Sequence, residues 1–166
     1  MTLKSFFHSG KRKVFGAVVL AALLSTGGVA TAVAQAKHIY PAIDAAPADI
    51  KAALAEAHRT HRRVIVDFGG DWCGDCKVLD IYFHQSPNDE LLAKNFVKVN
   101  INIGDQIDAN LDIGEKYGVV LKKGVPALAV LDEHGNVIFA QKTGEFENMR
   151  HLQSSDLTAF LNKWKR

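Results

Sequence analysis

The only two cysteines of this 166-residue chain lie three positions apart, within the segment Trp72–Cys76 (Trp-Cys-Gly-Asp-Cys). Two thiols with two residues between them can close into a small disulfide ring and reopen, a spacing typical of reversible dithiol chemistry. They are too close in sequence to join distant elements, so no disulfide can staple the fold. The domain must instead rely on burying apolar side chains, and the chain is long enough to bury a sizeable core.

The first 34 residues differ from the rest of the chain. Four basic side chains begin it, an apolar run from Val14 to Leu24 follows, and the segment ends in Ala32-Val33-Ala34. This pattern predicts a secretory signal peptide that is cleaved after Ala34, with Ala36 as a second position. The alternative is an uncleaved membrane anchor over residues 14–34, although small polar residues dilute its second half.

Export also changes the charge balance. Residues 1–34 carry four basic and no acidic side chains, so their removal takes the formal charge from +2 to −2. A mildly acidic domain gives no electrostatic reason to expect nucleic acid as a partner. We expect a signal peptide at 1–34, a linker at 35–46 and one domain at 47–166.

Hydrophobic periodicity predicts the order helix, strand, helix, strand, helix, hairpin, helix. The expected helices begin at Pro47, at Cys73, near a capping box at Ser86-Pro87-Asn88-Asp89, at Asp108, and near Ser154 or Ser155. The expected strands are 64–68, 96–101, 127–131 and 137–141. Because a strand-helix-strand unit gives a parallel pair and a hairpin an antiparallel one, we expect an α/β domain with a mixed central sheet covered by helices on both faces.

The cysteine pair is expected where a strand gives way to a helix. Unsatisfied N–H groups at a helix N-terminus stabilise a thiolate, so Cys73 is the expected nucleophile. Cys76 lies almost one turn further along and is expected to be more buried. Cys73 would attack a substrate disulfide, and Cys76 would then resolve the mixed disulfide.

A Cys-x-x-Cys pair can also be half of a zinc site. Structural zinc needs four ligands, usually including a second close pair, and the chain has no second pair. His58, His61 and His134 are not placed by sequence to complete such a site. We therefore expect no metal and no bound cofactor.

Asp67 interrupts the apolar run Val64–Phe68. A carboxylate inside a buried strand is costly unless it is paired or neutral, and burial raises its pKa. Since Asp67 lies six residues before Cys73, we interpret it as the acid/base that handles the Cys76 proton, through water. The alternative is a strand-end carboxylate that caps local amides.

Pro126 follows Gly124-Val125 at the start of the first hairpin strand. A cis Val125–Pro126 bond would expose backbone groups against which an extended peptide could pair. From these residues alone, an ordinary trans proline in a turn is the favoured interpretation.

Taken together, these motifs resemble the thioredoxin family in type and in order. The matching positions are Asp67-Phe68, Trp72-Cys73-Gly74, Cys76-Lys77, Gly124-Val125-Pro126 and Gly144. The resemblance implies a thioredoxin fold and thiol–disulfide exchange, with Cys73 as nucleophile, Cys76 as resolving thiol, Asp67 as buried acid/base and Pro126 as cis-proline. It also implies that Trp72 flanks the site and that Lys98 neighbours the buried carboxylate. Exported bacterial thioredoxin-like proteins, and the periplasmic domain of membrane thiol reductases, are similar to this chain.

The chain also departs from that family. Asp75 stands where proline is usual, Gly69 and Gly70 replace bulkier residues, and segments 119–123 and 145–153 look inserted. A carboxylate near Cys73 disfavours the thiolate, which would make the dithiol more reducing. Gly74 and Asp75 are therefore expected to modulate the redox poise.

The sequence thus predicts an exported, periplasmic thiol:disulfide oxidoreductase that acts on protein cysteines in the reducing direction. A membrane-bound electron donor would supply it, and the membrane itself is a partner only if the N-terminal segment stays uncleaved. Two other functions stay open at this level: a peptide-binding or chaperone module with little redox turnover, and a metal carrier that uses the two thiolates.

Overall fold

The computed structural model describes residues 38–166. The expected signal peptide at 1–34, and the first residues of the expected linker, lie outside this range. Within residues 38–166, no helix has both the length and the apolar character needed to cross a membrane.

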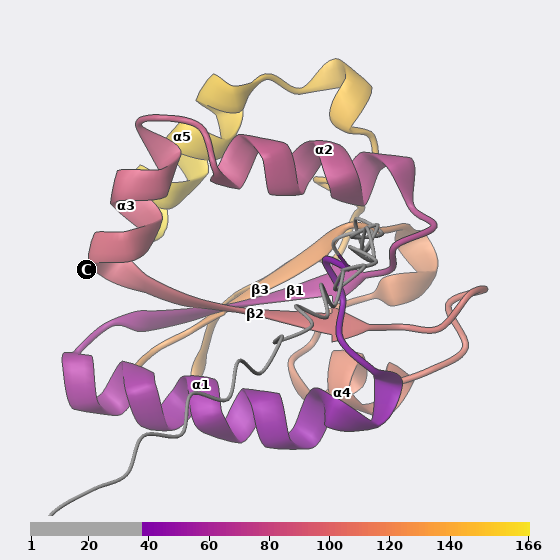
Figure 1. The fold of residues 1–166 in the computed structure, drawn as a ribbon, viewed down its shortest axis with the longest axis horizontal. Coiled ribbons are helices and arrows are strands. Elements are labelled where there is room, and N and C mark those ends of the chain that lie inside the picture. Colours follow the sequence, from indigo (N-terminus) through magenta and orange to yellow (C-terminus); the bar gives the residue numbers. More distant parts are fainter. Residues whose placement is uncertain (1–37) are drawn as a thin grey trace, which may run out of the picture. The chain divides into compact units, whose positions relative to one another are not determined.

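A four-stranded sheet runs through the centre of the domain (Figure 1). Its strands are β1 (Arg63–Gly69), β2 (Phe96–Asn102), β3 (Ala127–Leu131) and β4 (Val137–Ala140), in the order β2-β1-β3-β4. β1 pairs parallel with β2 and antiparallel with β3, and β3 pairs antiparallel with β4. The predicted mixed sheet is confirmed, and each strand lies within two residues of its expected bounds.

Helices cover both faces of this sheet (Figure 1). One face carries α1 and α4, and the other carries α2, α3 and α5. Their bounds are α1 Ala46–Thr60, α2 Gly74–Phe83, α3 Asn88–Asn95, α4 Leu111–Lys116 and α5 Ser154–Trp164. Three short 3-10 turns join them, at Ile43–Ala45, Leu121–Lys123 and Met149–His151. This is the expected thioredoxin-type α/β architecture.

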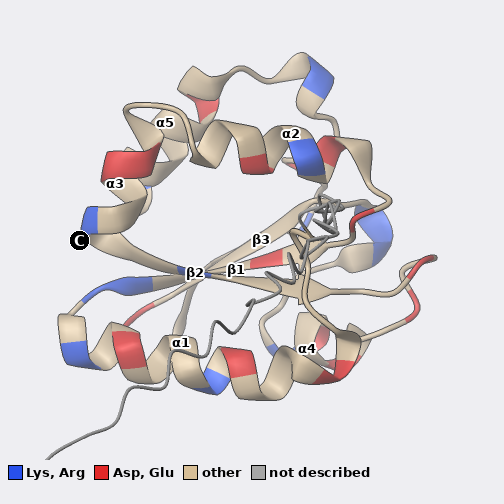
Figure 2. Cartoon of the chain, in the orientation of Figure 1, with Lys and Arg blue, Asp and Glu red and all other residues tan. Residues whose placement is uncertain are grey.

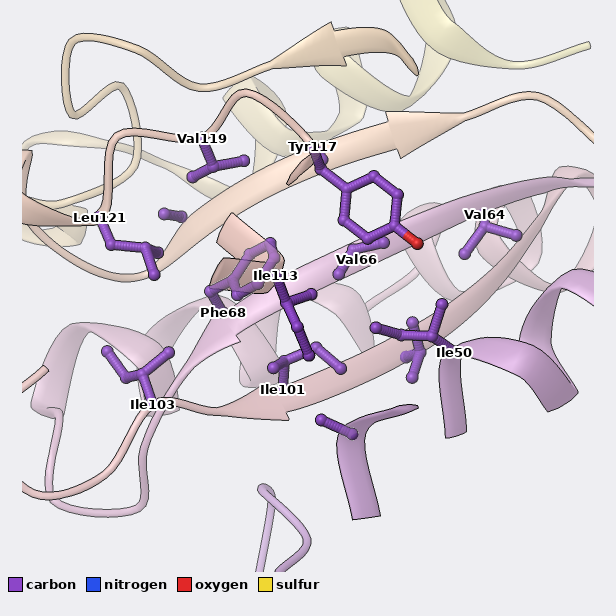
Figure 3. Close-up of a cluster of buried hydrophobic side chains, with 14 of the residues drawn as sticks. Ile50, Val64, Val66, Phe68, Ile101, Ile103, Ile113, Tyr117, Val119 and Leu121 are labelled. Atoms are coloured by element: carbon purple, nitrogen blue, oxygen red, sulfur yellow. The ribbon is translucent and has the colours of Figure 1, made fainter. Parts of the chain in front are cut away.

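β1 supplies side chains to two separate cores. Because successive side chains of a strand point to opposite faces, Val64, Val66 and Phe68 join the cluster on the α1 and α4 side, which Figure 3 shows. Ile65 joins the cluster on the α2, α3 and α5 side. All four are fully buried, which explains the apolar run without alternation.

The segment from His38 to Ala46 differs from the expected linker. Tyr40 is 3% exposed and Ala46 1% exposed, and both belong to the α1-side core. The backbone of this segment is held by the Asp71 carboxylate, which accepts hydrogen bonds from the N–H groups of Ile39 and Tyr40. A side chain that lies 31 and 32 residues away from these two N–H groups therefore orders a stretch that has no periodicity of its own.

Two helix starts were predicted too early. The capping box before α3 is wrong: α3 begins at Asn88, and the fully buried Asn88 side chain donates instead to the Tyr82 carbonyl. The helix expected from Asp108 begins only at Leu111, because Asn110 has a left-handed backbone (φ 55°) and its side chain donates to the Asn102 carbonyl.

Candidate active site

The cysteines lie where β1 gives way to α2. Cys73 is the N-cap residue of α2, with an extended backbone, and its Sγ accepts a hydrogen bond of 3.0 Å from the Cys76 N–H. The two sulfurs form a disulfide, with 5.2 Å between the Cα atoms. A sulfur at this position receives both a backbone donor and the positive end of the helix dipole, which favour its thiolate after reduction.

The two sulfurs differ in their access to solvent. Cys76 is fully buried and Cys73 is 5% exposed, while the neighbouring Trp72 is 47% exposed. A Cβ placed at Gly74, the residue after Cys73, would meet no atom of a residue outside this turn within 4 Å. Of the two cysteines, only Cys73 therefore retains contact with solvent.

Trp72 is fixed although half of it is exposed. Its Nε1–H donates a 2.6 Å hydrogen bond to the Gly104 carbonyl. A Cβ at Gly70 would come within 2.5 Å of the same Nε1 atom. Gly70 thus leaves room for the indole to lie against the loop that contains Gly104. This explains one of the two glycines that replace bulkier residues of the thioredoxin family.

Asp67 lies in the middle of the sheet, as the acidic segment of β1 in Figure 2. It is fully buried, and by strand alternation it projects on the α2 face together with Ile65. Burial raises the pKa of the Asp67 carboxyl, and the Lys98 ammonium and the Tyr40 hydroxyl partly offset that rise. Such a carboxyl is suited to proton exchange nearer neutrality than an exposed one.

Lys98 connects this buried carboxyl to the protein surface. Its Nζ lies 3.2 Å from Oδ2 of Asp67, 3.5 Å from Oδ1 of Asp80 and 2.6 Å from Oδ1 of Asn100. The Lys98 side chain is 11% exposed and lines a groove of about 650 Å³ beside β2. The pairing expected from the resemblance is present, and solvent reaches its cationic partner through this groove.

The loop before β3 lies against the reactive sulfur. The Val125–Pro126 peptide bond is cis, as the resemblance implied, and not trans, as the residues alone suggested. The Val125 carbonyl oxygen lies 3.6 Å from Cys73 Sγ. The buried Gln141 side chain donates to the Pro126 carbonyl and accepts from the Leu128 N–H, which fixes the backbone where the loop enters β3.

Asp75 lies in the first turn of α2 and contacts the inserted segment 145–153. Its Oδ1 accepts a 3.0 Å hydrogen bond from the Met149 N–H. Met149 and Phe146 of that segment are buried in the α2-side core. The insertion is therefore packed against the helix that carries the cysteines and is more than a surface loop.

Three residues of this region were missed from the sequence: Tyr40, Asp71 and Gln141. Tyr40 stood in a stretch taken for a linker, and Asp71 and Gln141 carry no spacing motif. A weak signal existed for Tyr40, since a large aromatic residue in a short segment next to the domain is a candidate for packing. Over residues 38–166, no cluster of three or more His, Cys, Asp or Glu side chains could hold a metal ion.

The fold and this disulfide define a dithiol–disulfide exchange site on a thioredoxin-type scaffold. A family model described as Thioredoxin-like matches residues 45–133, and the chain belongs to that family. It is accordingly a thioredoxin-like thiol:disulfide oxidoreductase.

Three relatives illustrate the match. A thioredoxin of Pseudomonas aeruginosa is 35% identical over 60% of this chain and 76% of its own length. The thiol:disulfide interchange protein DsbD 1 of the same species is 24% identical over 72% of this chain, which spans only 18% of that protein. The crystal structure of a disulphide isomerase from Xylella fastidiosa Temecula1 superposes with a TM-score of 0.71, at 32% identity, over 78% of this chain and 98% of that one.

Proposed function

We propose that this protein is an exported reductase of protein disulfides that works through its Cys-Gly-Asp-Cys pair. The observation that carries the proposal is the asymmetry of the two sulfurs. Cys73 lies at the open N-terminus of α2 beside the Val125 carbonyl, and Cys76 lies buried behind it. One sulfur is thus placed to meet a partner protein and the other to release it.

In the proposed reaction, the Cys73 thiolate attacks a substrate disulfide and expels one substrate thiolate. Asp67 accepts the proton of the Cys76 thiol, and the Cys76 thiolate then attacks Cys73 in the mixed disulfide. The second substrate sulfur leaves as a thiol after protonation, and the Cys73–Cys76 disulfide forms. Substrate is reduced by two electrons and the enzyme is oxidised by two, so a donor must reduce the enzyme again.

Two observations support the reducing direction. Asp75 places a carboxylate in the first turn of α2, where it opposes the accumulation of thiolate charge. The chain is also similar to a segment of DsbD 1, a thiol:disulfide interchange protein. A membrane-bound electron donor fits this direction, and the expected signal peptide fits a periplasmic location.

The function is tested by trapping substrates. Cys76→Ser removes the resolving thiol, so the protein should accumulate as mixed disulfides through Cys73. These appear as species of higher mass that disappear when dithiothreitol reduces the mixed disulfides. Mass spectrometry of those species identifies the substrates. Cys73→Ser is the matched control, since it keeps a single buried thiol and should trap nothing. If Cys76→Ser captures no thiol protein, exchange with protein cysteines is contradicted and a peptide-binding role is favoured.

A further inference from the structure

Residues 38–41 form a strap that lies close to the redox site. On one side, the Asp71 carboxylate holds it: Oδ1 accepts from the N–H groups of Ile39 (2.9 Å) and Tyr40 (3.3 Å), and Oδ2 lies 2.8 Å from Nδ1 of His38. Asp71 is in the loop between β1 and α2, two residues before Cys73. The strap is therefore tied to the loop that carries the nucleophile.

The edge of the sheet holds the strap on its other side. The side-chain amide of Asn100 donates to the Ile39 carbonyl at 2.7 Å, and that of Asn102 donates to the Pro41 carbonyl at 2.9 Å. Both asparagines belong to β2, the edge strand. Four backbone groups of the strap are thus bonded by side chains, which restricts where the intervening Tyr40 side chain can lie.

Tyr40 points from the strap into the site. Its ring is 3% exposed, and its hydroxyl donates a 3.1 Å hydrogen bond to Oδ1 of Asp67. A Cβ placed on Gly69 would collide with the Tyr40 hydroxyl and would lie 2.8 Å from Cys76 Sγ. The phenol oxygen and the buried sulfur therefore share the space above Gly69, which explains why glycine stands at this position.

Tyr40 gives Asp67 its only side-chain hydrogen bond among the described residues. Oδ2 of Asp67 accepts none, and the Lys98 ammonium lies 3.2 Å from it as an ion-pair partner. The charged and titratable groups that face Asp67 are Lys98 from β2, Asp80 from α2 and Tyr40 from the strap. After reduction, the thiol of Cys76 joins them.

We propose that Tyr40 is a positioning residue of the exchange reaction, whose hydroxyl orients Asp67 toward Cys76 and sets the pH at which that carboxyl accepts the Cys76 proton. This inference rests on the proposed function. Its chemistry adds no reactant: the proton moves from the Cys76 thiol to the Asp67 carboxylate, and the resulting thiolate attacks Cys73. Tyr40 acts on this step by holding the carboxylate in its charged form.

The test isolates the second chemical step with a chromophoric aromatic disulfide. Reduced protein releases one aromatic thiolate when Cys73 attacks, and a second when Cys76 resolves the mixed disulfide. In Tyr40→Phe, Asp67 loses its hydrogen bond, and its pKa rises. We expect the acid limb of the pH–rate profile for the second release to move up by about one pH unit. At pH values on that limb, the second release should therefore be about tenfold slower than in wild type. The first release should not change.

Tyr117→Phe is the matched control. Tyr117 is a buried tyrosine of the α1-side core (Figure 3), and among the described contacts it makes none to Asp67. The Tyr117→Phe change also removes one hydroxyl, and it should leave the rates of both thiolate releases at their wild-type values. An infrared titration of the carboxyl band in the oxidised protein, assigned with Asp67→Asn, gives a second readout that needs no turnover.

The outcomes separate the two proposals. A Tyr40→Phe profile that superimposes on wild type, or a slowing of both phases at every pH together with a lower melting temperature, overturns the role of Tyr40. If wild-type protein releases no second aromatic thiolate, the proposed exchange function itself fails, whatever Tyr40 does.

Discussion

Asp67 is the residue whose surroundings depart most from those of an ordinary carboxyl. It is fully buried, it has one hydrogen bond, and its cationic neighbour is shared with Asp80 and Asn100. Burial raises its folded-state pKa above that of the unfolded chain, so the folded protein holds this proton more tightly. The stability from this group is complete below the unfolded pKa of about 3.9 and is lost as pH rises through the folded pKa.

Asp67→Asn should therefore stabilise the protein at neutral and alkaline pH. The amide keeps an acceptor for the Tyr40 hydroxyl but carries no buried charge, and Lys98 retains Asp80 as a partner. We expect a gain of about 1–3 kcal/mol in the free energy of unfolding at pH 8, shrinking toward pH 4. Denaturant unfolding of the oxidised protein at several pH values measures it.

The matched control for this change is Asp105→Asn, at an exposed carboxylate. Its unfolding free energy should follow wild type within about 0.5 kcal/mol across the same pH range. A loss of stability in Asp67→Asn at pH 8 would contradict the unfavourable burial of the charge.

At the scale of elements, the start of α2 combines the nucleophile with a carboxylate that is already engaged. Asp75 accepts a hydrogen bond from the Met149 N–H, so most replacements of Asp75 remove both its charge and this contact with the inserted segment 145–153. Asparagine separates the two effects, because its side-chain oxygen can still accept from Met149 while the charge is gone.

We expect Asp75→Asn to be less reducing than wild type. Removing the carboxylate stabilises the Cys73 thiolate and hence the reduced form, by about 30 mV or about 1.4 kcal/mol for two electrons. Equilibration with glutathione measures the shift. Asp75→Leu serves as the comparison that also loses the hydrogen bond, and an equally or more reducing Asn variant would refute the role of the charge.

The elements themselves were largely predictable from local patterns. β1 and β2 are apolar runs with clear ends, and Cys73 caps α2 where the strand-to-helix change was expected. The errors fall where a distant side chain decides the backbone. Asn88 and Asn110 bond to the Tyr82 and Asn102 carbonyls, and Asp71 orders the strap that carries Tyr40. Such tertiary bonds leave no period in the sequence.

For the whole molecule, the open prediction is the processing of the N-terminal segment, whose expected cleavage positions follow Ala34 and Ala36. We expect expression of the full chain in a Gram-negative bacterium to yield a periplasmic protein whose first residue is Gln35 or Lys37, because the A-x-A pattern directs cleavage after Ala34 or Ala36. Mass spectrometry of the periplasmic fraction identifies the first residue.

The control for this prediction replaces Ala32 and Ala34 with leucine, which should leave the chain unprocessed. A wild-type chain that is recovered at full length in the membrane fraction would show instead that residues 14–34 act as an anchor. In either case the folded domain faces the same compartment, so the exchange chemistry is unaffected by this result.

The strap has a practical consequence for anyone who prepares this protein. Recombinant designs that trim the chain to its first long helix, α1 at Ala46, would delete the phenol above Asp67 and still retain both cysteines. Rates and potentials from such a shortened protein would describe an altered redox centre. Affinity tags are therefore better fused after Arg166 than directly before His38.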